Sequence, residues 1–190
     1  NLNPLPIAVS PLSQNKKSKD IFEKKLNIID IGSEISGVIE NNLKQSGLFN
    51  PLNKDAFLQK PDIAHLKPRF EDWALIKSQV LITGKVTSKI INDKDYINIE
   101  FKLWDVLGAK MVDGFSLTTT PRSWRRVGHK ISDKVYERLT GESGYFDTRI
   151  IYVAEEGPKT QRIKKLAIMD QDGFNTKYIT CLLYTSDAAD

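Results

Sequence analysis

The stretch that decides the fold runs from Thr120 to Val153 and reads TPRSWRRVGHKISDKVYERLTGESGYFDTRIIYV. Five apolar residues recur in it at spacings of three or four positions, which places them on one face of an α-helix. These residues are Trp124, Val127, Ile131, Val135 and Leu139. Because such a face is too apolar to stay in water, the helix is expected to pack against another part of the chain.

Both ends of this helix are marked by residues with known capping preferences. Thr120 can accept a hydrogen bond from a free amide of the first turn, and Pro121 suits the first helical position because its missing N–H costs nothing there. Gly141 suits the left-handed residue that ends a helix. A β-rich pattern begins at Arg149, so the segment around Gly144 is interpreted as a boundary between two domains.

Upstream of this helix, the pattern predicts a short strand, a loop and a second helix. Leu5–Val9 is an apolar run among prolines, which cannot donate to a β-ladder, so we expect a strand near a sheet edge. The polar and basic run 13–19 is interpreted as a loop. Helical spacing begins after Asp30 and stops at Ser46-Gly47.

The middle of the chain predicts a connection, a short helix and a meander of three strands. Residues 61–68 form the expected connection and residues 70–77 the short helix. The period then changes to two, which predicts strands over 80–88, 96–104 and 110–119. In the second strand the expected core face is Ile97, Ile99, Phe101 and Leu103. This order of elements predicts an α/β fold, a mixed sheet with packed helices.

The composition allows one ordinary globular core, or one domain plus a fragment of another. It has 190 residues, 40% of them hydrophobic, and a formal net charge of +4. Its longest apolar runs are far shorter than the roughly 20 residues that cross a bilayer. The chain begins without methionine or a signal peptide, at Asn1-Leu2-Asn3-Pro4, so a processed or incomplete N-terminus is expected.

The last ten residues, 181–190, are expected to be a non-native tail. They read CLLYTSDAAD, which resembles the translation of a sequencing adapter; the alternative is a natural disordered tail. The string holds the single cysteine, Cys181, and two aspartates, so residues 1–180 contain no cysteine and carry a formal charge of +6. A chain without cysteine has no disulfide and no thiol metal site, and it suits an oxidising compartment.

The sequence contains no arrangement typical of an enzyme, so we expect no catalytic residue, no cofactor site and no metal site. His65 and His129 fall in different elements, and His129 with Asp133 is interpreted as a solvent-facing pair. Residues 141–144, Gly-Glu-Ser-Gly, are one residue short of a nucleophile elbow. Residues 170–173, Asp-Gln-Asp-Gly, have their glycine two positions too early for a calcium loop and are interpreted as a hairpin turn.

Six basic residues on the outer side of the helix open a second hypothesis. With Asp133 and Glu137 they give residues 122–138 a net charge of +4, which makes nucleic-acid binding one interpretation and a solvated outer face the other. Of the aromatic residues here, Trp124 belongs to the buried face and only Tyr136 is left for base stacking. The six are Arg122, Arg125, Arg126, Lys130, Lys134 and Arg138.

Four segments resemble a known family. They are residues 118–153, PRFEDWALIKSQVLITGKV over 68–86, IEFKLWDVLGAKMV over 99–112, and KKLAIMDQDGFNTKYIT over 164–180. These segments closely resemble the TolB family, the periplasmic component of the Tol-Pal system of Gram-negative bacteria. The resemblance covers essentially all of residues 1–180.

The resemblance implies an N-terminal α/β domain over residues 1–145, followed over 146–180 by the first strands, the truncated start, of a β-propeller. It implies a non-enzymatic periplasmic protein that links TolA of the inner membrane to the lipoprotein Pal. Such a protein supports outer-membrane integrity, cell division and protein import. Its association with membranes would be peripheral, through these partners, and nucleic acid is not expected as a partner.

The chain departs from the family at both ends. In the family the TolA-binding segment lies just before the region of Leu2–Leu12, and the Pal-binding surface lies on the propeller. Both binding regions are therefore expected to be largely absent, and no partner-binding residue is transferred. Three strand patterns after Phe146 fall short of the four strands of a propeller blade, which predicts exposed strand edges that favour aggregation.

Overall fold

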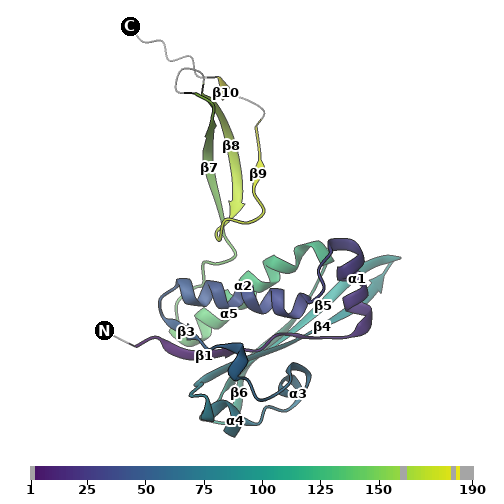
Figure 1. Ribbon diagram of the computed structural model, residues 1–190, viewed down its shortest axis with the longest axis vertical. Helices are drawn as coiled ribbons and strands as arrows, with labels where there is room; N and C mark the ends of the chain where they lie inside the picture. Colours follow the sequence, from purple (N-terminus) through teal and green to yellow (C-terminus); the bar gives the residue numbers. More distant parts are fainter. Residues whose placement is uncertain (1–2, 159–161, 181–182, 185–190) are drawn as a thin grey trace. The chain divides into compact units, whose positions relative to one another are not determined.

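The computed structural model describes residues 3–158, 162–180 and 183–184. The chain divides into two compact units, Asn1–Gly144 (unit 1) and Tyr145–Asp190 (unit 2), and each is described by itself. Figure 1 labels the helices and strands of both units.

Unit 1 is built on a mixed sheet in the order β3-β1-β4-β5-β6, with β2 paired further along β4. β1 runs parallel to β3 and β4, whereas β4, β5 and β6 form an antiparallel meander. The strands are β1 (Leu5–Val9), β2 (Ser13–Gln14), β3 (Phe49–Pro51), β4 (Val80–Ile91), β5 (Lys94–Asp105) and β6 (Lys110–Thr119). The predicted mixed sheet with packed helices is therefore confirmed for unit 1.

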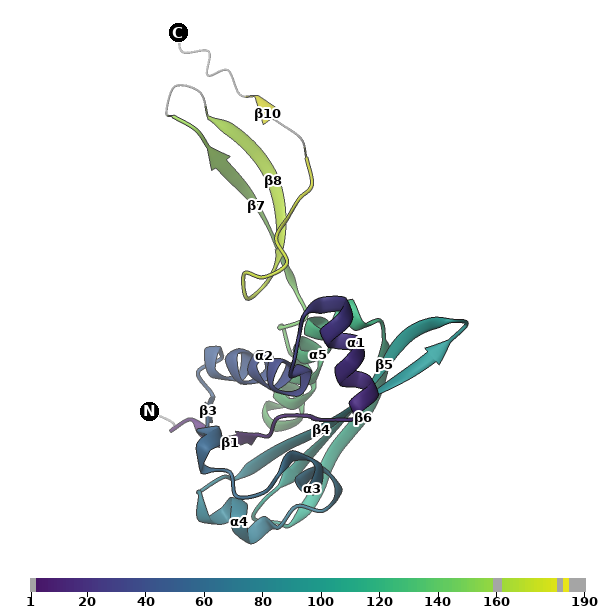
Figure 2. The ribbon, with the colours of Figure 1, turned by 45° about the vertical axis from the view of Figure 1, so that its right-hand side comes forward.

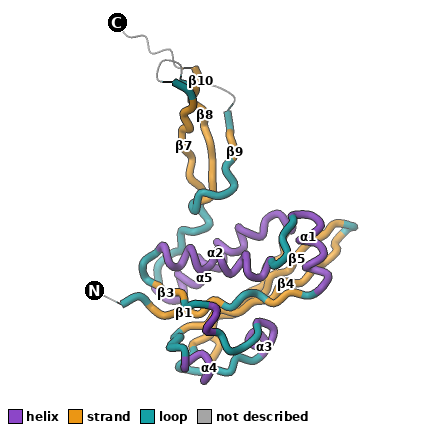
Figure 3. Tube along the Cα trace, in the orientation of Figure 1, coloured by secondary structure: helices purple, strands orange, loops and turns teal. Residues whose placement is uncertain are grey.

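Helices cover both faces of this sheet (Figure 3). Three of them, α1 (Lys16–Leu26), α2 (Ile31–Gln45) and α5 (Trp124–Thr140), lie on one face, and α3 (Pro61–Leu66) and α4 (Phe70–Leu75) lie on the other. The predicted core face of β5 is confirmed, since its four residues are at most 1% exposed. The alternate side chains of β4 and β5, such as Leu81 and Trp104, belong to the core on the α3–α4 side.

The helix that decides the fold is confirmed, with one change at its start. Thr120 makes no side-chain cap, and its hydroxyl lies 3.2 Å from that of Ser123, because a 3-10 turn over Pro121–Ser123 leads into α5. Gly141 ends α5 in the left-handed conformation, at φ 80°. Val127, Ile131 and Val135 are buried, as their spacing predicted.

A close contact joins α2 and α5. A Cβ atom at Gly128 of α5 would lie 2.9 Å from Cγ1 of Val38 in α2, so the two helices approach through this glycine. At Gly37 of α2, by contrast, a Cβ atom would face open space.

Two other predictions for unit 1 are wrong. The predicted loop 13–19 contains the start of α1, which Asn15 caps by accepting from the Ser18 amide at 2.8 Å. The predicted connection 61–68 contains α3. β1 lies next to the edge strand β3, near the sheet edge as predicted, and the carbonyl of Pro6 accepts from the Gln79 amide at 3.0 Å.

The β4–β5 hairpin is longer than predicted and extends past the rest of the sheet (Figure 2). Asn92 and Asp93 form its turn with φ of 49° and 58°, the left-handed values that two-residue hairpin turns need. Near this turn, Lys25 of α1 pairs with the carboxylate of Asp95.

Unit 2 is a small antiparallel sheet in the order β10-β8-β7, with β9 also paired to β8. Its strands are β7 (Arg149–Glu156), β8 (Ile163–Asp170), β9 (Lys177–Tyr178) and β10 (Leu183–Tyr184). The predicted turn between β8 and β9 is confirmed: Gly173 has φ 86° and its amide donates to Asp170 O at 2.9 Å. β10 falls within the predicted non-native tail, whose other residues lie outside the described ones.

Large apolar side chains remain exposed on this small sheet. Those that are 41–61% exposed are Ile150, Ile151, Val153, Phe174, Tyr178 and Ile179. In the part of unit 2 that the structure describes, β7 pairs with β8 alone. The sheet therefore offers an open edge and apolar faces, which are features that promote association between chains.

We expect the exposed sheet of unit 2 and the buried sheet of unit 1 to differ in their rates of amide hydrogen exchange. In the monomeric chain, amides of Arg149–Glu156 should exchange faster than those of Val80–Val86, which lie inside the sheet of unit 1. Mass spectrometry of peptic fragments at low protein concentration measures both. Equal strong protection of the two strands in a monomer would contradict the account of unit 2.

Candidate functional site

A buried polar cluster lies between α3 and the sheet. His65 is 2% exposed, and its Nδ1 atom lies 3.3 Å from Oγ1 of the fully buried Thr83. Trp104 Nε1 donates to the same hydroxyl at 2.9 Å. On the other side of the ring, Nε2 lies 3.6 Å from Glu100 Oε1, and Lys102 Nζ donates to the backbone carbonyl of His65 at 3.2 Å.

The surroundings of His65 keep its ring neutral. Burial is the largest effect and lowers its pKa, because a charged imidazolium loses its hydration there; Lys102 lowers the pKa further, and Glu100 opposes both. A hydroxyl that is both buried and already bonded to an indole cannot reach a substrate. The cluster is therefore suited to holding α3 on the sheet rather than to catalysis.

His129 contradicts the predicted solvent-facing pair with Asp133, because it is 2% exposed. Its Nδ1 atom lies 3.0 Å from Nδ2 of Asn42 in α2, which also donates to Ser132 Oγ at 2.9 Å. Asn42 and Ser132 are fully buried, so this polar group links α2 to α5. The small residues Gly128 and Ser132, four positions apart, mark a close helix contact, and that spacing is the signal that could have placed His129 beside it.

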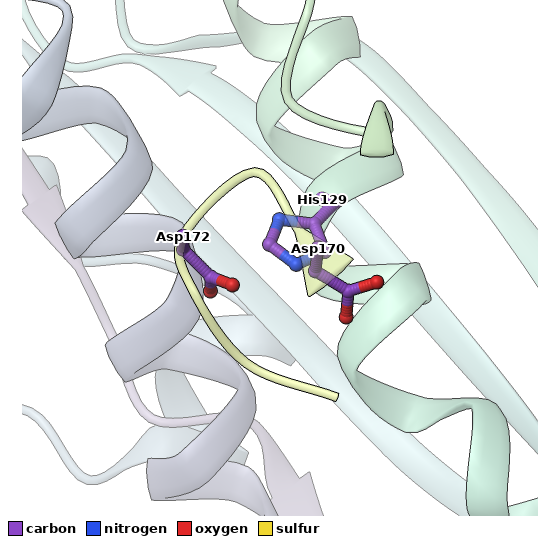
Figure 4. A group of neighbouring side chains, drawn as sticks. All are labelled: His129, Asp170 and Asp172. Atoms are coloured by element: carbon purple, nitrogen blue, oxygen red, sulfur yellow. The ribbon is translucent and has the colours of Figure 1, made fainter. Parts of the chain in front are cut away.

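Figure 4 draws His129 with Asp170 and Asp172. The histidine comes from α5 of unit 1 and the two aspartates from unit 2, so the three side chains do not form a site within either unit. Within unit 2, the aspartates stabilise their own turn. Asp170 accepts from the side chain of Asn175, and Asp172 Oδ1 accepts from the Phe174 amide at 3.3 Å.

The aromatic residue that nucleic-acid binding would need belongs to the core. Tyr136 is 8% exposed, and its ring meets that of Phe49 edge-on, with centroids 6.3 Å apart. Trp124 is half-buried, and the Arg125 guanidinium lies over its ring at 5.4 Å. Neither ring offers an open stacking platform beside the basic residues.

Four of the six basic residues form a line along α5 at a spacing of four positions. We call this line the basic row; it consists of Arg126, Lys130, Lys134 and Arg138. The row follows strand β6: Arg138 Nε donates to Val112 O at 3.4 Å, and Lys134 Nζ lies 3.9 Å from Asp113 Oδ2. Sequence reasoning found these residues but gave no indication that they run beside a strand.

A small hollow lies between the end of β6 and the start of α5. Its volume is about 130 Å³. It is lined by Leu117, Thr118, Thr119, Ser123, Arg126, Val127 and Lys130. Two cationic side chains and three hydroxyl-bearing residues make this a suitable environment for an anionic group.

None of the helices in the described part of the chain is long and apolar enough to cross a membrane.

A family model and a curated relative identify the family, and a crystal structure shares the fold. Residues 1–112 match the family model of the TolB amino-terminal domain. The Tol-Pal system protein TolB of Pelagibacter ubique (strain HTCC1062) is 69% identical over 180 residues, which are 95% of this chain and 40% of that protein. The crystal structure of TolB from Acinetobacter baumannii aligns with a TM-score of 0.71 at 22% identity, over 93% of this chain and 38% of the other.

The architecture and the family model together define the class: unit 1 contains a TolB-type amino-terminal domain, a mixed sheet with helices on both faces. The chain belongs to the TolB family and is a homologue of the Tol-Pal system protein TolB. It spans about 40% of the length of the curated relative that it matches.

The lowered pKa of His65 predicts a dependence of stability on pH. The unfolded chain protonates His65 near its ordinary pKa of about 6.5, whereas the folded chain resists protonation until a lower pH, so acidification favours the unfolded state. The unfolding free energy should therefore fall between pH 7.5 and pH 5.5, more steeply for the wild type than for His65→Gln. Urea titrations at several pH values measure both slopes, and identical slopes would contradict a neutral buried His65.

Proposed function

We propose that this chain is part of a periplasmic, non-enzymatic interaction component of the Tol-Pal system, which links TolA and Pal. The observation that supports this most strongly is 69% identity to a Tol-Pal system protein TolB over 95% of the chain. Identity at this level along nearly the whole chain favours a shared role in outer-membrane integrity, cell division and protein import.

The two units divide this proposed role. Residues 1–145 act as the N-terminal α/β domain, and residues 146–180 begin a β-propeller. The exposed apolar side chains of unit 2 support the second assignment, because a propeller blade covers such faces with neighbouring blades. The segments that contact TolA and Pal would lie mostly outside residues 1–180.

The polar clusters of unit 1 support a role without catalysis. His65 and Thr83 are buried and bonded to each other, and Trp104 donates to Thr83, so these side chains stabilise the fold instead of facing a substrate. Nucleic-acid binding is a weaker candidate, because Tyr136 is part of the core.

A chimaera in a bacterium tests this function. In a Gram-negative strain that lacks its own TolB, residues 1–144 would replace the corresponding domain of the host TolB. The chimaera keeps the host's own segment upstream of Leu2 and the host propeller, which supply the regions expected to contact TolA and Pal. It should therefore restore detergent resistance and stop leakage of periplasmic enzymes.

The matched control carries Ile39→Asp, which places a carboxylate in a fully buried position of α2 and should abolish the rescue. Immunoblots of the periplasmic fraction report how much of each protein accumulates. A chimaera that accumulates to the level of host TolB while leakage continues would refute the proposed role of unit 1.

A further inference from the structure

Strand β6 forms one edge of the sheet of unit 1. Within the described residues it pairs with β5 alone, so one side of its backbone has no strand partner over Lys110–Thr119. Gly114, Ser116 and Thr118 are exposed along it. An edge of this length can accept a further strand through main-chain hydrogen bonds.

The basic row lies beside this edge for most of its length. Its contacts with β6 run in order along the strand: Arg138 reaches Val112, Lys134 reaches Asp113, and Lys130 lines the hollow at Leu117–Thr119. α5 and β6 are therefore aligned side by side, and a strand added outside β6 would have one set of its side chains facing the row.

The two repeats match in length. Residues four apart on a helix are separated by about 6 Å along its axis, and alternate residues on a strand by about 6.7 Å. The spacing of every second side chain on an added strand is therefore close to the spacing of the cations along the row. This similar spacing favours binding of an extended segment in which every second residue carries the same kind of side chain.

The charges of the row indicate which kind of side chain the alternate residues of such a segment would carry. Lys130 is exposed and makes no ion pair within the part of the chain that the structure describes. Lys134 has two partners, Asp113 at 3.9 Å and the exposed Glu137 at 3.4 Å, and ion pairs of these lengths at the surface are weak. The four cations of the row outnumber the three nearby carboxylates, Asp113, Asp133 and Glu137, so the row keeps a net positive formal charge and alternate carboxylates are its complement.

We infer that β6 and the basic row form a docking edge for an extended acidic segment of a partner protein, which adds as a strand to β6 and places alternate Asp or Glu side chains along the row. The hollow at Leu117–Thr119 takes one of these carboxylates beside Lys130. This site rests on α5 and β6 alone and does not depend on the proposed links to TolA and Pal.

Two other roles of the same residues predict different results in binding experiments. A purely protective role, in which lysines prevent edge pairing, would exclude added strands altogether. Nucleic-acid binding would use the charges of the row but not the backbone of β6.

The binding test uses the full chain and three fluorescent nine-residue peptides. One alternates Asp with Val or Thr, one has the same composition with all acids together, and one alternates Lys in place of Asp. Fluorescence anisotropy at physiological salt should show binding of the alternating acidic peptide at least about tenfold tighter than of the block peptide, and no binding of the basic one.

Charge reversal then locates the site. Lys130→Glu should weaken binding of the alternating acidic peptide about tenfold or more. The double variant Lys130→Glu with Lys134→Glu should weaken it further. The matched control is Lys44→Glu, an exposed lysine of α2 with the same change in net charge. Equal losses for Lys44→Glu and Lys130→Glu would overturn the site, because they would reflect net charge only.

Backbone methylation tests strand addition on the unaltered protein. Only every second amide of an added strand faces β6, so N-methylation of one alternate set should abolish binding and methylation of the other set should leave it within a few fold. On binding, amides over Gly114–Thr119 should gain hydrogen-exchange protection. Equal effects of both methylated sets, or binding of single-stranded DNA but not of the peptide, would overturn the inference.

Discussion

The packing of α5 on α2 and the sheet is the interaction on which the rest of unit 1 depends. Val127, Ile131 and Val135 are buried on this side of the sheet, and Gly128 lets the two helices approach at Val38. This contact fixes the rotation of α5 about its own axis. Because the rotation is fixed, the opposite side of the helix lies along β6 and carries the basic row.

Local periodicity was sufficient for the elements with a strong repeat. α2, α5 and the β4–β5–β6 meander follow from spacings of 3.6 and 2, and the C-terminal end of α5 and the β8–β9 turn follow from glycines with left-handed backbone. The pairing partners of β1 did not follow, because parallel pairing with β3 and β4 joins distant segments and leaves no local signal. α1 and α3 were missed because each buries only two residues, too few for an apolar stripe.

Only part of the candidate site could be predicted from the sequence. The basic residues of α5 were found, yet their alignment with an edge strand is a property of tertiary packing. Tyr136 and His129 were expected in solvent because neither belongs to the predicted apolar face of the helix. Each instead packs against a residue of another element, Phe49 and Asn42 respectively. The burial of a polar residue next to a small one on a helix can therefore be predicted only when the packing of the neighbouring helix is known.

The most direct test of the α2–α5 contact is the same substitution at two helical glycines. Gly37→Ala, in open space on α2, should raise the unfolding free energy by about 0.5–1 kcal/mol, since alanine is the better helix former. Gly128→Ala should lower it instead, because the new methyl group would meet the stiff, β-branched Val38 at 2.9 Å. Urea unfolding of both variants beside the wild type decides the matter, and an equal gain in stability from the two substitutions would contradict the account.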